Sequence, residues 1–159
     1  MGDNIVVGIA DMKMCRRGDT LTTLGLGSCV GLVLYEPGSH ISAMMHIMLP
    51  DSAEFSDDRQ IYKFADTSVA AVLKEFRGAG ILASSLCAKL AGGARMFSFG
   101  SDVFNIGKKN VDAVHEILER EQIRLVSEDC GGNYGRTVSF DATDFSMTIK
   151  AVGKTVKVI

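Results

Sequence analysis

The pattern of apolar positions divides the chain into a strand-rich first third, two helices and a strand-rich end. Strands are predicted over 5–14, 20–26, 30–36 and 41–48, which are short and largely apolar stretches. The last two strands are separated by EPGSH, whose Pro-Gly pair is typical of a tight turn. We therefore expect 30–36 and 41–48 to form a hairpin.

Side chains along the second strand of this hairpin should alternate between the two faces of the sheet. Counting back from a turn centred near Gly38, position 46 falls opposite about position 30. Cross-strand neighbours have Cβ atoms roughly 4.5–5.5 Å apart, so the hairpin is expected to bring His46 beside Cys29. One face should carry Ile41, Ala43, Met45 and Ile47, and the other Ser42, Met44, His46 and Met48.

Two segments show helical periodicity, 58–77 and 109–122. Asp57 and Gln60 resemble a capping box before the first, and the glycines at 78 and 80 indicate its end. The expected core positions are Ile61, Phe64, Ala65, Val69, Val72, Leu73 and Phe76 in the first helix, and Val111, Val114, Ile117 and Leu118 in the second.

The remaining segments are predicted to be strands. Residues 84–99 should form two strands broken by the pair Gly92-Gly93, and 123–152 should form three strands joined by turns. Runs of strands with two inserted helices favour an α+β fold with mixed or antiparallel sheets. The length of 159 residues fits a single domain covering 1–159.

Composition and charge narrow the functional classes. The chain is 47% hydrophobic and 23% charged with a net charge of -2, which is ordinary for a globular protein. No block of Lys and Arg suggests nucleic acid or an anionic membrane as a partner. No secretory signal or membrane-spanning run is recognisable, so we expect a cytoplasmic protein without direct membrane insertion.

The four cysteines, Cys15, Cys29, Cys87 and Cys130, are widely spaced and form no C-x-x-C pair. Zinc-ribbon and thioredoxin-like sites therefore have little support, and no metal or other cofactor is expected. In a cytosolic chain, reduced thiols are the expected state, and most of them should be small apolar core residues.

Cys29 differs because it lies in the glycine-rich stretch GLGSCVG, which leaves the backbone around its sulfur open. The stretch departs from the dinucleotide fingerprint, and a strand rather than a helix follows it. GSCVG matches the nucleophile elbow of α/β-hydrolases, but the absence of a following helix rejects that fold. Cys29 can thus be a core residue or a nucleophile with space around it.

A catalytic thiol needs a nearby base. His115 lies inside the second predicted helix and is best explained as an edge residue with a structural partner, and His40 lies in the Pro-Gly turn, where we expect it to be solvated. His46 is the remaining candidate base for Cys29, because the hairpin carries it back to the start of the preceding strand.

Several motifs together resemble the CheD family, the chemoreceptor glutamine deamidases of bacterial and archaeal chemotaxis. They are TLGLGSCVGLVLYEP, His46 in the next strand, AKLAGGARMF, IGKKN and DCGGNYGR, and the resemblance covers about residues 5–150. It implies a layered sandwich of sheets with the helices packed outside. It also implies a site made of Cys29, His46 and Thr23, six residues before the cysteine. Thr22 is one residue out of register with the family threonine.

The resemblance implies an activity and partners. Cys29 would attack a receptor glutamine, a thioester would form, and water would release glutamate. Methyl-accepting chemotaxis receptors would be the substrates and the CheC phosphatase a binding partner, with Phe104 a candidate contact or a residue packed under its loop.

Cys130 stands where we expect an aliphatic residue in the family. Two alternatives are an adaptor with little catalysis and a Cys-His hydrolase or transglutaminase-like enzyme acting on another amide.

Overall fold

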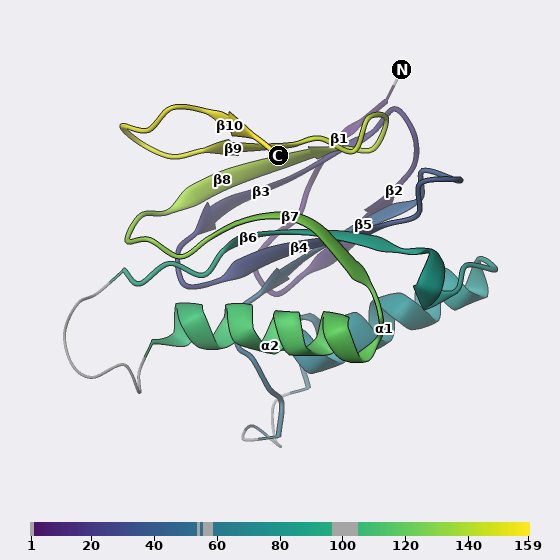
Figure 1. Ribbon diagram of the computed structural model, residues 1–159, viewed down its shortest axis with the longest axis horizontal. Coiled ribbons are helices and arrows are strands. Elements are labelled where there is room, and N and C mark those ends of the chain that lie inside the picture. Colours follow the sequence, from purple (N-terminus) through teal and green to yellow (C-terminus); the bar gives the residue numbers. More distant parts are fainter. Residues whose placement is uncertain (1, 54, 56–58, 97–104) are drawn as a thin grey trace.

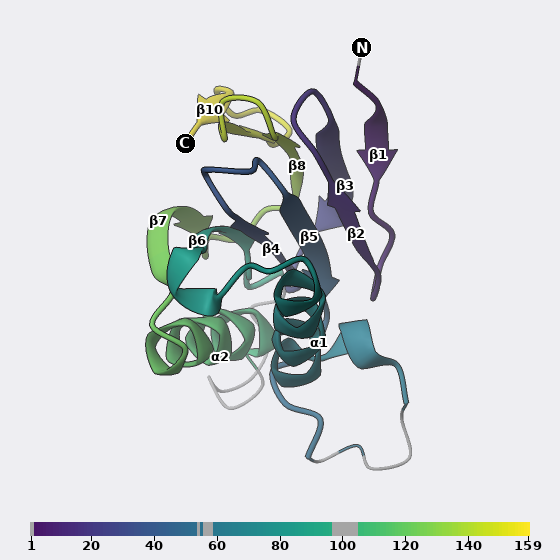
Figure 2. The ribbon, with the colours of Figure 1, turned by 90° about the vertical axis from the view of Figure 1, so that its right-hand side faces the viewer.

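The computed structural model describes residues 2–53, 55, 59–96 and 105–159, in which two sheets and two helices form three layers (Figures 1 and 2). The outer sheet has the strand order β1-β3-β8-β9-β10, and the central sheet has the order β2-β5-β4-β6-β7. The outer strands are β1 (Asn4–Val6), β3 (Thr20–Leu26), β8 (Arg136–Asp141), β9 (Met147–Lys150) and β10 (Lys157–Val158). The central strands are β2 (Met12–Cys15), β5 (Ser42–Ile47), β4 (Val30–Tyr35), β6 (Cys87–Gly92) and β7 (Arg124–Cys130).

Both long helices, α1 (Ala65–Gly78) and α2 (Ile106–Arg120), lie on the face of the central sheet that is turned away from the outer sheet (Figure 2). Two short 3₁₀ turns, η1 (Ile61–Lys63) and η2 (Ala83–Ser85), flank α1. Each sheet contains one parallel pair, β1 with β3 and β6 with β7, among antiparallel ones. The expected α+β sandwich of mixed sheets with outside helices is confirmed. No helix in these described ranges is long and apolar enough to span a membrane.

The central sheet is buried on both faces, so it separates two apolar cores. The helix-side core packs Val30, Leu32 and Leu34 of β4 against α1 and α2. The inter-sheet core packs Val33 and Tyr35 of the same strand against the outer sheet. Every residue of β4 and β5 is buried, which explains their nearly continuous apolar sequence.

The predicted hairpin is confirmed. Strand β4 pairs antiparallel with β5, and Gly31 lies opposite His46, one residue from the predicted position. The predicted alternation along β5 also holds, since Ala43, Met45 and Ile47 belong to the helix-side core and Met44 to the inter-sheet core. The turn is closed by hydrogen bonds from His40 N to Glu36 O and from Glu36 N to Ile41 O.

The single strand predicted over 5–14 is wrong, because the chain changes sheets within it. Strand β1 belongs to the outer sheet and β2 to the central one. Ala10, in the segment between them, has a left-handed φ of 56°, which interrupts any continuous extended strand.

The helix boundaries differ from the predicted ones. Helix α1 begins at Ala65 rather than near Asp58, and its N-cap Phe64 offers no side-chain hydrogen bond, so the capping-box assignment does not apply to it. Asp57 lies outside the described residues. The predicted end is confirmed at Gly78, with Gly80 left-handed at φ 81°.

Helix α2 begins at Ile106, three residues before the predicted start, because Asn105 caps it by accepting a hydrogen bond from Lys108 N. The strand predicted after Gly93 is not formed over the described residues 94–96. The three C-terminal strands are confirmed as β7, β8 and β9, and the two-residue β10 was not predicted.

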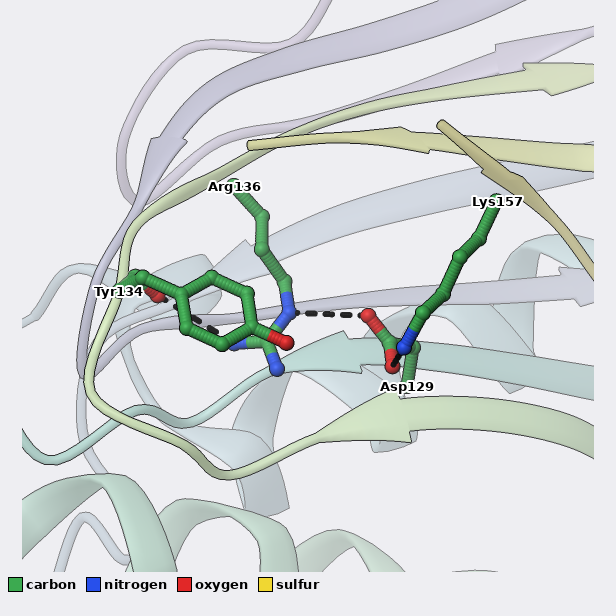
Figure 3. A network of polar contacts seen from close by, with 4 residues as sticks. All are labelled: Asp129, Tyr134, Arg136 and Lys157. Carbon is green, nitrogen blue, oxygen red and sulfur yellow. Dashed lines mark hydrogen bonds and ion pairs between the residues drawn. The ribbon is translucent and has the colours of Figure 1, made fainter. Parts of the chain in front are cut away.

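A cluster of charged side chains joins the two sheets where β7 faces β8 (Figure 3). Asp129 accepts a hydrogen bond at 3.0 Å from Arg136 Nε and another at 3.2 Å from Lys157 Nζ. The guanidinium of Arg136 also lies 4.3 Å from the centre of the Tyr134 ring. The Arg136 side chain is 1% exposed, so its charge depends on these partners rather than on water.

Candidate active site

His46 and Thr23 meet in the layer between the two sheets. His46 is carried by β5 of the central sheet and Thr23 by β3 of the outer sheet, and both are buried. The Thr23 hydroxyl lies 2.7 Å from His46 Nδ1 and donates a hydrogen bond at 2.8 Å to the Val7 carbonyl. Thr22, the neighbouring residue, faces the other way and bonds Asn4 and Ser139, so the threonine implied by the resemblance is the one beside the histidine.

These two contacts assign the tautomer of His46. A hydroxyl has one proton, and a carbonyl oxygen can only accept, so the Thr23 hydroxyl must donate its proton to Val7 O. The short contact to Nδ1 therefore requires the ring to donate Nδ1–H to the Thr23 oxygen. In the neutral imidazole, Nε2 is then left with a free lone pair. Thr23 and Val7 O thus prepare His46 to accept a proton at Nε2.

The environment of His46 keeps its ring neutral. Burial lowers the pKa of His46 below its ordinary value, since the charged imidazolium loses its hydration. Nε2 is itself buried and has no hydrogen-bond partner among the described residues. Such a buried basic nitrogen without a partner is costly in a folded protein, and it is the feature expected of a base whose partner is a reacting group.

Cys29 lies at the start of β4 on the same side of the central sheet as His46. Its side chain packs against the inter-sheet core. Gly31 is the residue directly opposite His46, which makes Cys29 and His46 diagonal neighbours across the hairpin. Gly31 has no side chain, so no Cβ stands between the diagonal pair. The thiol does not hydrogen-bond Nε2 in this resting arrangement, and contacts of this kind often shorten only when substrate binds.

Burial of Cys29 favours the protonated form of its thiol. Burial raises the pKa of Cys29, and its own backbone N–H opposes this rise. To act as a nucleophile, a protonated thiol beside a neutral imidazole would need a base at the moment of attack. This pair therefore resembles a serine-histidine pair more than a preformed thiolate-imidazolium ion pair.

The loop that presents Cys29 is fixed in place by hydrogen bonds that its backbone carbonyl groups accept from the segment after β6. Gly27 O accepts from Ala94 N and Cys29 O from Gly93 N, both at 2.8 Å. A Cβ at Gly92 would lie 2.4 Å from the Cys29 carbonyl oxygen, so only glycine allows β6 to approach this closely. The pair Gly92-Gly93, first interpreted as a strand break, is therefore the support for the loop that carries Cys29, the candidate nucleophile.

The other singled-out residues lie outside this arrangement. His115 contacts Glu128 at 3.0 Å, in agreement with its assignment as an edge residue with a partner. The expectation of a solvated His40 is wrong. Its ring is half-buried, stacks on Phe145 and contacts Ala142 O at 2.8 Å, because the turn folds back on the outer sheet. Phe104 lies outside the described residues.

All four cysteines carry free thiols. Cys130 ends β7 and packs against the helix-side core, whereas Cys29 packs against the inter-sheet core. The two thiols therefore face opposite sides of the central sheet, and the structure does not place them as a pair. No group of three metal-ligating side chains occurs in the part of the chain that the structure describes.

Two contributors to the site were not identified from the sequence. Val7 acts through a backbone carbonyl, which leaves no trace in residue type. Its segment also holds the His46 backbone, since Ala10 N donates to His46 O and His46 N to Asp11 O, both at 3.1 Å. Asn110 of α2 is fully buried and bonds the nucleophile loop. Its signal was a polar residue within the apolar stripe of the second predicted helix.

Comparisons with known proteins agree on one family. Residues 48–151 match the family model described as CheD chemotactic sensory transduction. The protein named probable chemoreceptor glutamine deamidase CheD of Lachnoclostridium phytofermentans is 47% identical over 100% of both chains. The protein of the same name from Desulforamulus reducens is 49% identical over 98% of this chain and 95% of its own.

A third relative with that name, from Caldanaerobacter subterraneus subsp. tengcongensis, is 46% identical over 96% of each chain. The family-model match begins after His46, whereas these alignments extend over nearly the whole chain and so reach the segment that carries Thr23, Cys29 and His46. The family inferred from the motifs is confirmed, and the chain belongs to the CheD family.

Proposed function

We propose that this protein is a cysteine-dependent protein-glutamine deamidase of the chemotaxis system. Its substrates are side-chain amides of methyl-accepting chemoreceptors, acted on in the cytoplasm. The observation that carries the proposal is the buried His46 Nε2, left as a bare proton acceptor by the Thr23–Val7 contacts and lying diagonal to the Cys29 thiol. The names of the aligned relatives supply the substrate class.

In the first half of the proposed reaction, Nε2 of His46 takes the thiol proton while Cys29 Sγ bonds to the carbonyl carbon of the glutamine side chain. The resulting tetrahedral oxyanion needs hydrogen-bond donors, and the backbone N–H groups of Ser28 and Cys29 are our candidates. His46 then returns the proton to the leaving nitrogen, and ammonia departs. A thioester between Cys29 and the glutamyl side chain remains.

In the second half, water attacks the thioester carbonyl and His46 Nε2 removes its proton. The carbon–sulfur bond breaks, the proton passes to the sulfur, and the substrate leaves as glutamate. Each cycle consumes one water, releases one ammonia and replaces a neutral amide by a carboxylate. No external oxidant, reductant or cofactor enters this sequence.

Mass spectrometry of a purified receptor cytoplasmic fragment tests the proposal. Incubation with the wild-type protein should convert specific glutamines to glutamates, detected as the mass gain of an NH₂-to-OH exchange. Cys29→Ala should reduce the rate by about 10³-fold or more, because no other group supplies the nucleophile. Cys87→Ala is the matched control, since Cys87 is another half-buried cysteine packed on the inter-sheet core.

If the wild-type protein converts no glutamine on any cognate receptor, the deamidase assignment fails, and the adaptor alternative becomes the better explanation. If Cys87→Ala abolishes activity as fully as Cys29→Ala does, the nucleophile has been misassigned.

The family resemblance also leads us to propose the CheC phosphatase as a partner. Binding of CheC to wild type and to Phe104→Ala, measured by titration calorimetry, tests that contact.

A further inference from the structure

The side chain of Asn110 joins the two strands that carry the proposed catalytic pair. Its Nδ2 donates one hydrogen bond to Ser28 O at 2.9 Å and one to Met48 O at 3.0 Å. Ser28 immediately precedes Cys29, and Met48 follows His46 by two residues. One amide group on α2 therefore fixes the backbone beside the nucleophile relative to the backbone beside the base.

The orientation of this amide is determined by its partners. Both groups that it meets are carbonyl oxygens, which only accept, so the NH₂ end must face them and each of its protons serves one carbonyl. The remaining oxygen, Oδ1, is buried and has no hydrogen-bond partner in the described ranges. Asn110 is 0% exposed and lies one turn before Val114 on the face of α2 that packs against the sheet. An apolar residue would avoid the unpaired oxygen, so packing alone does not explain an asparagine here.

The contact with Ser28 O also sets the direction of the Cys29 N–H. A trans peptide is planar, so its C=O and N–H point in opposite directions. Because Asn110 holds Ser28 O towards α2, the Cys29 N–H points away from the helix, towards the inter-sheet layer.

Close packing allows the helix to reach these carbonyls. A Cβ at Gly107 would lie 2.3 Å from Ala94 O, and one at Gly93 would lie 2.4 Å from Val111 Cγ2. Glycines at both positions let α2 approach the β6 end and the nucleophile loop closely enough for Asn110 to bond them. The three successive carbonyls of Gly27, Ser28 and Cys29 are then each held by a separate donor.

We propose that Asn110 is a positioning residue that sets the Cys29 loop, with the Cys29 N–H as a candidate oxyanion donor, against the His46 strand. The proposal rests on the proposed function, because it gives the deamidation reaction a further determinant. Asn110 is 0% exposed, so it acts through the backbone groups that it bonds rather than through contact with substrate. Its loss should lower kcat more than it raises KM, since a displaced nucleophile loses rate while substrate contacts elsewhere persist.

The test compares Asn110→Asp, Asn110→Ser and the control Val114→Ala with the wild type. Asp has the same shape as Asn but replaces the two donor protons with an oxygen facing two carbonyls. Asn110→Ser has a smaller side chain with one donor, so this variant tests the positioning role if Asn110→Asp does not fold. Val114→Ala loosens the same face of α2 without touching the nucleophile loop. Each protein is measured for thermal midpoint, for kcat and KM of deamidation, and for the rate of iodoacetamide alkylation of Cys29 as a function of pH.

The expected result is that the Asn110 variants lose about tenfold or more in kcat with KM within about threefold. The pH profile of Cys29 alkylation should also shift in these variants. Val114→Ala should match their loss of thermal midpoint while keeping the wild-type kcat and alkylation profile. A folded Asn110 variant with wild-type kcat and profile would overturn the proposal, as would a control that loses both equally. If the wild type deamidates nothing, the proposed function fails, and the alkylation profiles alone decide the role of Asn110.

Discussion

At the scale of single residues, the site depends on one proton at Nδ1 of His46. Thr23→Val keeps the shape of the side chain but removes the hydroxyl, so Nδ1 loses the acceptor that fixes the tautomer. We expect kcat to fall by about 10²-fold, the range typical of an impaired general base. Thr23→Ser, which keeps the hydroxyl, should retain most of the activity. Nitrogen NMR of His46 should show the proton on Nδ1 in the wild type and divided between both nitrogens in Thr23→Val. A wild-type rate in Thr23→Val would contradict this role.

The protonation of His46 predicts the acid limb of the pH–rate profile. In the proposed mechanism activity requires neutral His46, and burial lowers the pKa of His46 below its ordinary value of 6.5. Activity should therefore persist as the pH falls to 6.5 and disappear only below that value, when Nε2 becomes protonated. Steady-state kcat/KM, whose pH dependence reports groups of the free enzyme, tests this between pH 5 and pH 8, with the ring titration followed by NMR in Cys29→Ala. A limb lying above pH 6.5 would show that His46 is not the base.

The sequence was informative about side chains whose chemistry is distinctive and less so about backbone groups. Cys29 and His46 could be paired by counting along a hairpin, because the turn fixes which residues lie opposite one another and side chains alternate between the two faces of a strand. Thr23 came from the family resemblance, since a β-branched residue in a strand needs no special explanation. Val7 could not be found in this way, because any residue type supplies the same carbonyl.

At the scale of elements, the local sequence pattern predicted whether a segment is a helix or a strand better than it predicted where that segment begins and ends. The β4–β5 hairpin was identified because a Pro-Gly turn and two apolar runs are local signals. The break between β1 and β2 was missed because the sheet change at Gly8–Ala10 depends on which distant strand each half joins. Strand β10 is two residues long and is defined only by its pairing with β9, so it has no periodicity to recognise.

Two helix glycines give opposite predictions for the same substitution. Gly78, the last residue of α1, has open space where a Cβ would stand, so Gly78→Ala should stabilise the fold by about 0.5–1 kcal/mol. Gly107→Ala would place a Cβ 2.3 Å from the Ala94 carbonyl, so α2 must shift away from β6. We expect Gly107→Ala to lose stability and, because Asn110 moves with the helix, to lose deamidase activity as well. Denaturant unfolding and deamidation of both variants test this, and a stabilised, fully active Gly107→Ala would contradict it.

At the scale of the whole molecule, the candidate site crosses the boundary between the two sheets. His46 comes from the central sheet and Thr23 from the outer one, so their contact requires the sheets to stay in fixed relation. The Asp129–Arg136–Lys157 cluster links the sheets near the nucleophile loop, since Arg136 pairs with Leu26, three residues before Cys29 (Figure 3). The cluster therefore lies close in the fold to the segment that leads from β3 to Cys29.

The ion pairs of Asp129 predict how stability depends on acid. Burial alone would raise the pKa of Asp129, but hydrogen bonds and positive charge from Arg136 and Lys157 outweigh it and hold that pKa below its ordinary value. A carboxyl whose folded pKa is lowered stabilises the fold fully above its unfolded pKa of about 3.9, and this contribution disappears as the pH falls through the lowered folded pKa. The Asp129 contribution should thus be constant from pH 7 to about 5 and decline below about 4.

Asp129→Asn should destabilise the protein by about 3 kcal/mol at pH 7, because it leaves the buried Arg136 charge without its counter-ion. Asp112→Asn, which removes the exposed Lys108–Asp112 pair on α2, is the control and should cost less than about 1 kcal/mol. Urea unfolding between pH 7 and pH 3 should show a shallower acid decline in Asp129→Asn than in the wild type. Equal declines would mean that the acid dependence of stability comes from other carboxyls and not from Asp129.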